Sequence, residues 1–86
     1  FALAEEAMEN ALVASIFGRR VKIATPEYLI LLKLIPLGAQ DKIDIGALIR
    51  KADRRQLRVL ARKHFLLARL ESVLQEAQTK RSRNGD

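Results

Sequence analysis

The segment that most restricts the fold is residues 26–35, an almost wholly apolar run that follows a helix-start signal. Thr25 is suited to cap free amide groups, Pro26 fits the first helical position, and Glu27 suits the first turn. The residues after them are apolar on nearly every side, and other elements must bury such a helix in water. We therefore expect residues 26–35 to form a buried central helix. The run is too short for a membrane span, which needs about 18 apolar residues.

Further helices are expected on both sides of this centre, within one small domain of residues 1–80. The spacing of apolar side chains predicts helices over residues 2–17, 41–50, 54–63 and 65–80. Gly18 is placed where the first of these would end, and Asp53 is a good N-terminal cap for residues 54–63. The last two helices could also be one continuous helix. Residues 81–86 are polar and are expected to form a disordered tail.

Residues 19–24 alternate between basic and apolar side chains and predict a short β-strand. The expected fold class is therefore mainly α, with about four or five helices and one short strand. A single strand leaves backbone donors and acceptors unpaired. It must join strands from a missing part, pair with a second copy of the chain, or not be a strand. We expect a homo-oligomer that forms through strand 19–24 and the apolar helix 26–35.

Composition removes several classes of site. The chain has no cysteine, which excludes disulfides, thiolate metal sites and a cysteine nucleophile. Tryptophan is absent and aromatic residues make up 5%, which argues against a base-stacking platform. His64 is the only histidine, and we expect it to be a partly buried residue at a helix junction. No membrane partner is expected, and a cytoplasmic location is predicted.

Several short motifs between residues 17 and 50 occur in an order that resembles a known family. A strand ends in Val21-Lys22-Ile23-Ala24, and Thr25-Pro26-Glu27 begins a helix that contains Leu31-Leu32-Lys33-Leu34. The acidic stretch Gln40-Asp41-Lys42-Ile43-Asp44-Ile45 follows. This order is similar to the C-terminal part of polymerase-β-like nucleotidyltransferases, in particular the abortive-infection, toxin-type group and its uncharacterised relatives.

The resemblance implies transfer of a nucleotide from a nucleoside triphosphate with Mg²⁺ in an intact relative. It places Lys33 near the nucleotide phosphates, Asp44 in support of the active site, and Asp41 beside it. An ammonium group can neutralise triphosphate charge, and carboxylates can orient a group or hold a cation. The residues also have a purely structural interpretation. Lys33 can lay its stem along apolar neighbours, and both aspartates suit the start of a helix.

Two departures from the family pattern concern catalysis. The chain has no Gly-Ser pair and no Asp-x-Asp or Asp-x-Glu pair, which the family uses upstream to hold its metals. Gln40 also replaces the basic residue that usually precedes Asp41, and Pro36 interrupts the helix. We therefore expect no catalytic or metal-binding residue and no cofactor in this chain alone. The chain begins at Phe1 and not at methionine, so we also expect a fragment. The resemblance implies that its missing half supplies the metals.

Charge is unevenly distributed, and this favours an alternative function. Residues 1–49 have a net charge of −1, whereas residues 50–83 have a net charge of +8. The basic face consists of Arg50, Lys51, Arg54, Arg55, Arg58 and Arg62. Such a face suits the phosphates of a nucleic acid bound without sequence preference. It could equally be a solvated surface, and the chain could then be a purely structural oligomerisation element.

Overall fold

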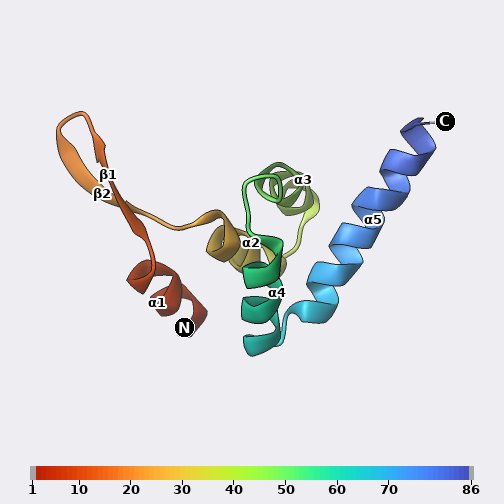
Figure 1. Cartoon of the computed structure of the whole chain (residues 1–86), viewed down its shortest axis with the longest axis horizontal. Helices are drawn as coiled ribbons and strands as arrows, with labels where there is room; N and C mark the ends of the chain where they lie inside the picture. The colour runs from red at the N-terminus through yellow and green to blue at the C-terminus, as the bar shows by residue number, and fades with distance from the viewer. Residues whose placement is uncertain (1, 86) are drawn as a thin grey trace.

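Helix α2 (Pro26–Leu34) lies among the other helices, as its apolar sequence predicts (Figure 1). The computed structural model describes residues 2–85, with side chains up to residue 77. In these residues the remaining elements are α1 (Ala2–Glu9), β1 (Leu12–Ile16), β2 (Arg19–Ile23), α3 (Ala39–Leu48), α4 (Arg54–Lys63) and α5 (Leu67–Gly85). The predicted fold class, mainly α with a short β segment, is confirmed.

The core forms where four helices contact α2. Ile30, Leu31 and Leu34 of α2 are completely buried. Their buried neighbours in the core come from each of the other helices and include Leu3, Ile45, Leu57, Ala61 and Leu70. Burial of this kind stabilises a fold by about 1.5–3 kcal/mol for each large apolar side chain. The sequence-based expectation of a buried central helix is therefore confirmed.

Local hydrogen bonds fix where α4 begins. The Asp53 carboxylate accepts hydrogen bonds from the backbone amides of Arg55 (3.0 Å) and Gln56 (3.2 Å), which makes it the expected N-terminal cap. Its own backbone amide donates to the buried Glu27 carboxylate at 2.7 Å. This bond ties the start of α4 to the first turn of α2. In contrast, Thr25 has the extended backbone of a cap residue but makes no side-chain capping bond.

A tight C-terminal cap separates α4 from α5, so these are two helices and not one. The amide of Leu66 donates to the Ala61 carbonyl at 2.7 Å, and the amide of Phe65 donates to the Arg62 carbonyl at 3.2 Å. This is the Schellman arrangement, which requires a residue with positive φ after the cap. Phe65 occupies that position with φ 60°. The residue is 94% exposed, so burial of its ring does not compensate for the backbone conformation. An L residue is strained in this conformation.

The predicted helix over residues 2–17 is wrong in its second half. α1 ends at Glu9, where the Asn10 side-chain amide donates to the Glu6 carbonyl at 2.9 Å. Residues Leu12–Ile16 then form β1, which pairs antiparallel with β2 from Leu12 opposite Ile23 to Ile16 opposite Arg19. Leu12, Ala14 and Ile16 share one face of a strand as readily as Met8, Leu12 and Ile16 share one face of a helix. Pairing with β2 satisfies the backbone and decides between the two.

The turn between the strands explains the role of Gly18, which is not a helix cap. Phe17 has φ 52° and Gly18 has φ 76°, as a two-residue type I′ hairpin turn requires. The predicted strand 19–24 is observed as Arg19–Ile23, but its expected lack of a partner within the chain is wrong. The inner edge of β2 is occupied by β1.

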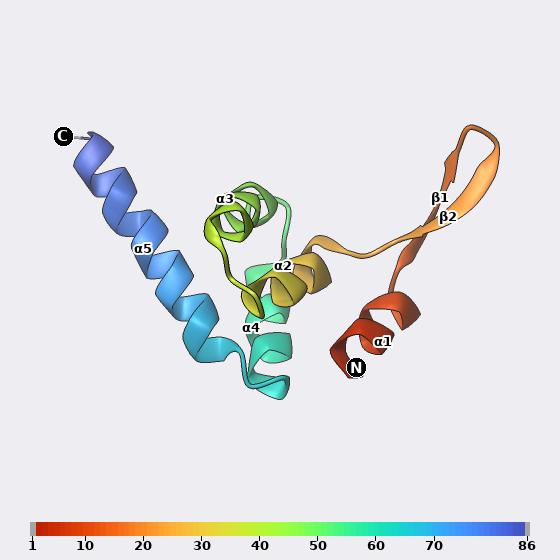
Figure 2. The same ribbon diagram turned by 180° about the vertical axis from the view of Figure 1, so that it is seen from behind.

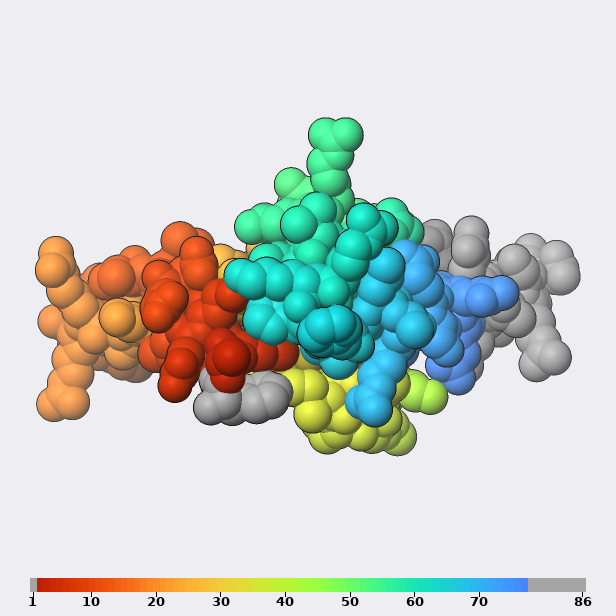
Figure 3. Space-filling view, turned by 90° about the horizontal axis from the view of Figure 1, so that it is seen from below, coloured from red at the N-terminus to blue at the C-terminus, as the bar shows by residue number. Residues whose placement is uncertain are grey.

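The hairpin projects from the helices, and α5 extends on the opposite side (Figures 1 and 2). The space-filling view in Figure 3 shows the hairpin atoms at one end of an elongated surface. The radius of gyration is 14.2 Å, whereas a compact domain of this length would have about 12 Å. The shape therefore reflects two arms attached to a small helical core.

Self-association remains a prediction. The apolar helix, one of its two expected contacts, does not need a second copy to cover its apolar side chains. The apolar side chains Ile30, Leu31 and Leu34 of the segment 26–35 are buried inside the chain. The hairpin still exposes apolar side chains and is the segment that a second copy could cover.

Helix α5 extends beyond its expected end at residue 80. The side chains of residues 78–86 lie outside the described residues, so the disordered tail expected over residues 81–86 stays a prediction.

Candidate functional site

The three residues singled out by the family resemblance meet at one place on the surface. The Lys33 ammonium, near the end of α2, lies 2.8 Å from the Asp44 carboxylate of α3. It also lies 3.8 Å from the carboxylate of Asp41, one turn earlier on α3. The cluster forms because α2 and α3 pack against each other after a short turn, which places the end of α2 beside the first turns of α3. The side chains are between a quarter and a third exposed.

Each charge in this cluster is already opposed by a partner. The hydrogen bond to Asp44 raises the pKa of Lys33, and the same bond, with a second from Gln40, lowers the pKa of Asp44. Asp41 accepts a hydrogen bond from the Gly38 amide at 2.9 Å, which completes the first turn of α3. The aspartates thus have the structural role that the helix start predicts. The ammonium is accessible, but contact with a phosphate would require it to exchange Asp44 for that ligand.

The cluster does not provide a complete metal site. Asp41 and Asp44 are its only carboxylates, and both face Lys33. Throughout the described residues there is no group of three or more His, Cys, Asp or Glu side chains that could hold a metal ion. The donor set of these residues therefore does not fit the Mg²⁺ implied by the resemblance. Carboxylates from beyond the described residues would have to complete such a site.

The basic face divides into a paired part and an unpaired part. Arg54, Arg58 and Arg62 lie within an arc of about 80° on α4. Arg58 donates to the Glu71 carboxylate of α5 at 2.8 Å. The other basic side chains of this face make no ion pair or hydrogen bond with the described residues; they are Arg50, Lys51, Arg54, Arg55 and Arg62. The face therefore presents cations that remain available to an anion.

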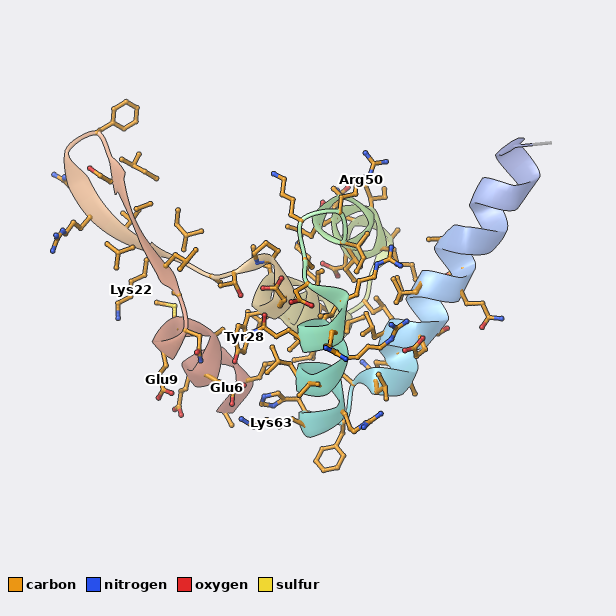
Figure 4. All side chains as sticks on the ribbon, in the orientation of Figure 1. Glu6, Glu9, Lys22, Tyr28, Arg50 and Lys63 are labelled. Carbon is orange, nitrogen blue, oxygen red and sulfur yellow. The ribbon has the colours of Figure 1, made fainter. Side chains whose placement is uncertain are left out.

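A groove lies beside this face, between the end of α3, the first half of α4 and the first half of α5. Its volume is about 650 Å³, and Arg50, Arg54 and Arg58 line it together with Glu71. Figure 4 shows Arg50 at the end of α3. Three of the six predicted basic residues therefore converge on one groove, while Lys51, Arg55 and Arg62 are not among its lining residues.

A second charged cluster was not predicted from the sequence. Glu6 of α1 accepts hydrogen bonds from the Tyr28 hydroxyl (2.9 Å) and from Lys63, and His64 Nε2 lies 2.9 Å from the same carboxylate. Figure 4 shows Glu6, Tyr28 and Lys63 close together between α1 and α4. His64 is 14% exposed at the end of α4, as expected for a residue at a helix junction.

The contacts within this cluster shift the pKa values of Glu6 and Tyr28. Hydrogen bonds from Lys63, His64 and Tyr28 lower the pKa of Glu6 to about 2, against the opposing effect of burial. Burial and the bond to Glu6 raise the pKa of Tyr28 to about 12. The cluster fastens α1 to the core. The only hints in the sequence are an acidic residue on α1 and a Lys-His pair 57 and 58 residues later.

Comparison with known proteins does not place the chain in a family. No protein-family model, curated protein or solved structure matches it. In the described part of the chain, no helix combines the length and apolar character needed to cross a membrane.

Proposed function

We propose that this chain is a module of a nucleotidyltransferase-like protein, corresponding to the C-terminal part of that fold, and that it is not catalytic alone. The observation that carries the proposal is the meeting of Lys33, Asp41 and Asp44. Lys33 and Asp44 are eleven residues apart on different helices, yet their side chains lie 2.8 Å apart. The family resemblance assigns these three residues to one nucleotide site, which is consistent with this geometry. The metals would come from the remainder of the protein.

The hairpin supports the idea of a module within a larger architecture. One face of it combines apolar side chains from both strands, because residues opposite each other in the register share a face. These side chains are Leu12, Ala14, Ile16, Val21 and Ile23. Leu12 is 65% exposed and Ile23 is 44% exposed. Two-stranded sheets are marginal in water, and an added strand or layer would bury this face.

A nucleotide titration tests the proposal. We expect the amide resonances of Lys33 and Asp44 to shift when ATP, GTP, CTP or UTP is added with Mg²⁺ at millimolar concentration. Lys33→Gln should abolish these shifts because it removes the only ammonium in the cluster. Lys42→Gln is the matched control, since Lys42 is also on the α3 side of the molecule and pairs with Glu76 instead.

The proposal fails if no shift occurs at millimolar nucleotide, or if Lys42→Gln removes the shifts as completely as Lys33→Gln does. The first result would leave the Lys33 cluster with its structural role alone. The second would show a non-specific attraction between the basic protein and the triphosphate.

A second candidate function is non-specific binding of nucleic acid through the basic face. The unpaired cations around α4 favour it, because phosphate contacts provide most of the affinity of such binding. The absence of aromatic side chains among the six residues of the face argues against base stacking. Replacing Arg54, Arg58 and Arg62 together with glutamine should abolish retention on DNA or RNA at low salt. Retention that survives this change would exclude the candidate.

A further inference from the structure

Three arginines line the groove between α3, α4 and α5. Arg50 follows α3, Arg54 and Arg58 lie one turn apart on α4, and all three line the same space of about 650 Å³. Residues one turn apart on a helix have side chains about 5–6 Å from each other. Arginines so placed can grip neighbouring phosphate groups, since each guanidinium presents a planar fork of donors.

One of these arginines already has an acidic partner within the groove, which would compete with a bound anion. Glu71 of α5 accepts a hydrogen bond from Arg58 at 2.8 Å, and both side chains are 48% exposed. Among the described residues that line the groove, Glu71 is the only acidic one. Arg50 and Arg54 have no such partner there. A ligand with negative charge would therefore meet two free guanidinium groups first and displace Glu71 from the third.

We infer that this groove binds the phosphodiester backbone of a nucleic acid, with Arg50, Arg54 and Arg58 as the contacts and Glu71 as a competing internal anion. The inference rests on the second function proposed above and narrows the basic face to three residues. A polymer is favoured over a small anion because Arg55, Arg62 and Lys51 extend the positive charge beyond the groove. The described walls include Ile49 and Leu74 but no aromatic side chain, so the groove would not distinguish base sequences.

The experiment measures binding of a fluorescently labelled 20-nucleotide RNA by anisotropy, with salt varied between 50 and 200 mM. Each of Arg50→Gln, Arg54→Gln and Arg58→Gln should weaken binding several-fold and lower the slope of log K against log salt by about 1. Arg19→Gln and Arg20→Gln are the controls, because both arginines are exposed on β2 of the hairpin and lie outside the basic face, and they should change the slope by much less. Glu71→Gln should tighten binding several-fold because it releases Arg58.

Thermal melting of each variant confirms that it is folded, which is expected because all the substituted side chains are exposed. If the control variants weaken binding as much as the groove variants, nucleic-acid binding stands but the groove is not its site. If inorganic tripolyphosphate displaces the RNA at equal phosphate concentration, the ligand is a small polyphosphate and the backbone assignment is wrong. If the unmodified chain does not bind RNA at 50 mM salt, both the groove and the second candidate function fail.

Discussion

The helices and the hairpin of this chain differ in how much of their apolar surface is buried. The helices bury Ile30, Leu31 and Leu34 completely within the chain. The hairpin satisfies its backbone by pairing β1 with β2, but it leaves Leu12 65% exposed and Phe17 fully exposed. Hydrogen bonding and apolar burial are separate requirements, and the hairpin meets only the first of them. The helical part is therefore a complete small core, whereas the hairpin is suited to a partner.

The largest expected difference between the helices and the hairpin is in the loss of stability when an apolar side chain is shortened to alanine. Leu31→Ala should lower the free energy of unfolding by about 3 kcal/mol because it opens a cavity in a fully buried site. Ile16→Ala in β1 should cost less than about 0.5 kcal/mol, since that side chain is already 46% exposed. Urea denaturation of both variants measures the difference. Equal losses would show that the hairpin belongs to the same cooperative core.

The next effect concerns the charged cluster that attaches α1 to the helices. Glu6→Gln should destabilise the protein by about 2 kcal/mol at pH 7, because it weakens hydrogen bonds to a charged group that is 19% exposed. Glu5→Gln, on the exposed side of the same helix, is the control and should have little effect. Thermal unfolding at pH 7 measures both. A loss at Glu5→Gln equal to that at Glu6→Gln would contradict the role of the cluster.

The same cluster predicts the direction of the pH dependence. The pKa of Glu6 is lowered from its ordinary 4.5 to about 2 in the folded state. The unfolded chain therefore takes up this proton first as the pH falls, and the stabilisation present above about pH 4.5 is lost between there and about pH 2. Urea denaturation across this range should show a smaller loss in Glu6→Gln than in the unmodified chain. Parallel curves for the two proteins would exclude Glu6 as the source.

A smaller effect compares two exposed phenylalanines with left-handed backbone. Phe65 ends α4 with φ 60°, and Phe17 lies in the hairpin turn with φ 52°. Phe65→Gly should stabilise the protein by about 1 kcal/mol, or raise Tm by about 4–8 °C, because glycine adopts this conformation without strain. Phe17→Gly should leave Tm almost unchanged, since the turn is not part of the core. A larger gain at Phe17 would mean that hairpin formation limits global stability.

The sequence predicts helices better than it predicts the hairpin or the sites. α4 and its cap were predictable because Asp53 and the apolar spacing of Leu57 and Ala61 are local signals. β1 was not, because the same apolar residues suit a helix and a strand, and the choice depends on pairing with β2. Lys33 and Asp44 could be named from local motifs. The contact between Glu6 and His64 joins positions 58 residues apart and requires the packed structure.

Native-state hydrogen exchange tests the difference between the two regions most directly. At low protein concentration, the amides of Ile30 and Leu31 should exchange only through global unfolding, with the full denaturant dependence of that process. The hydrogen-bonded amides of β1 and β2 should exchange through local opening, at a much lower free energy and with little dependence on denaturant. Hairpin amides that exchange with the same free energy and denaturant dependence as α2 would contradict the account.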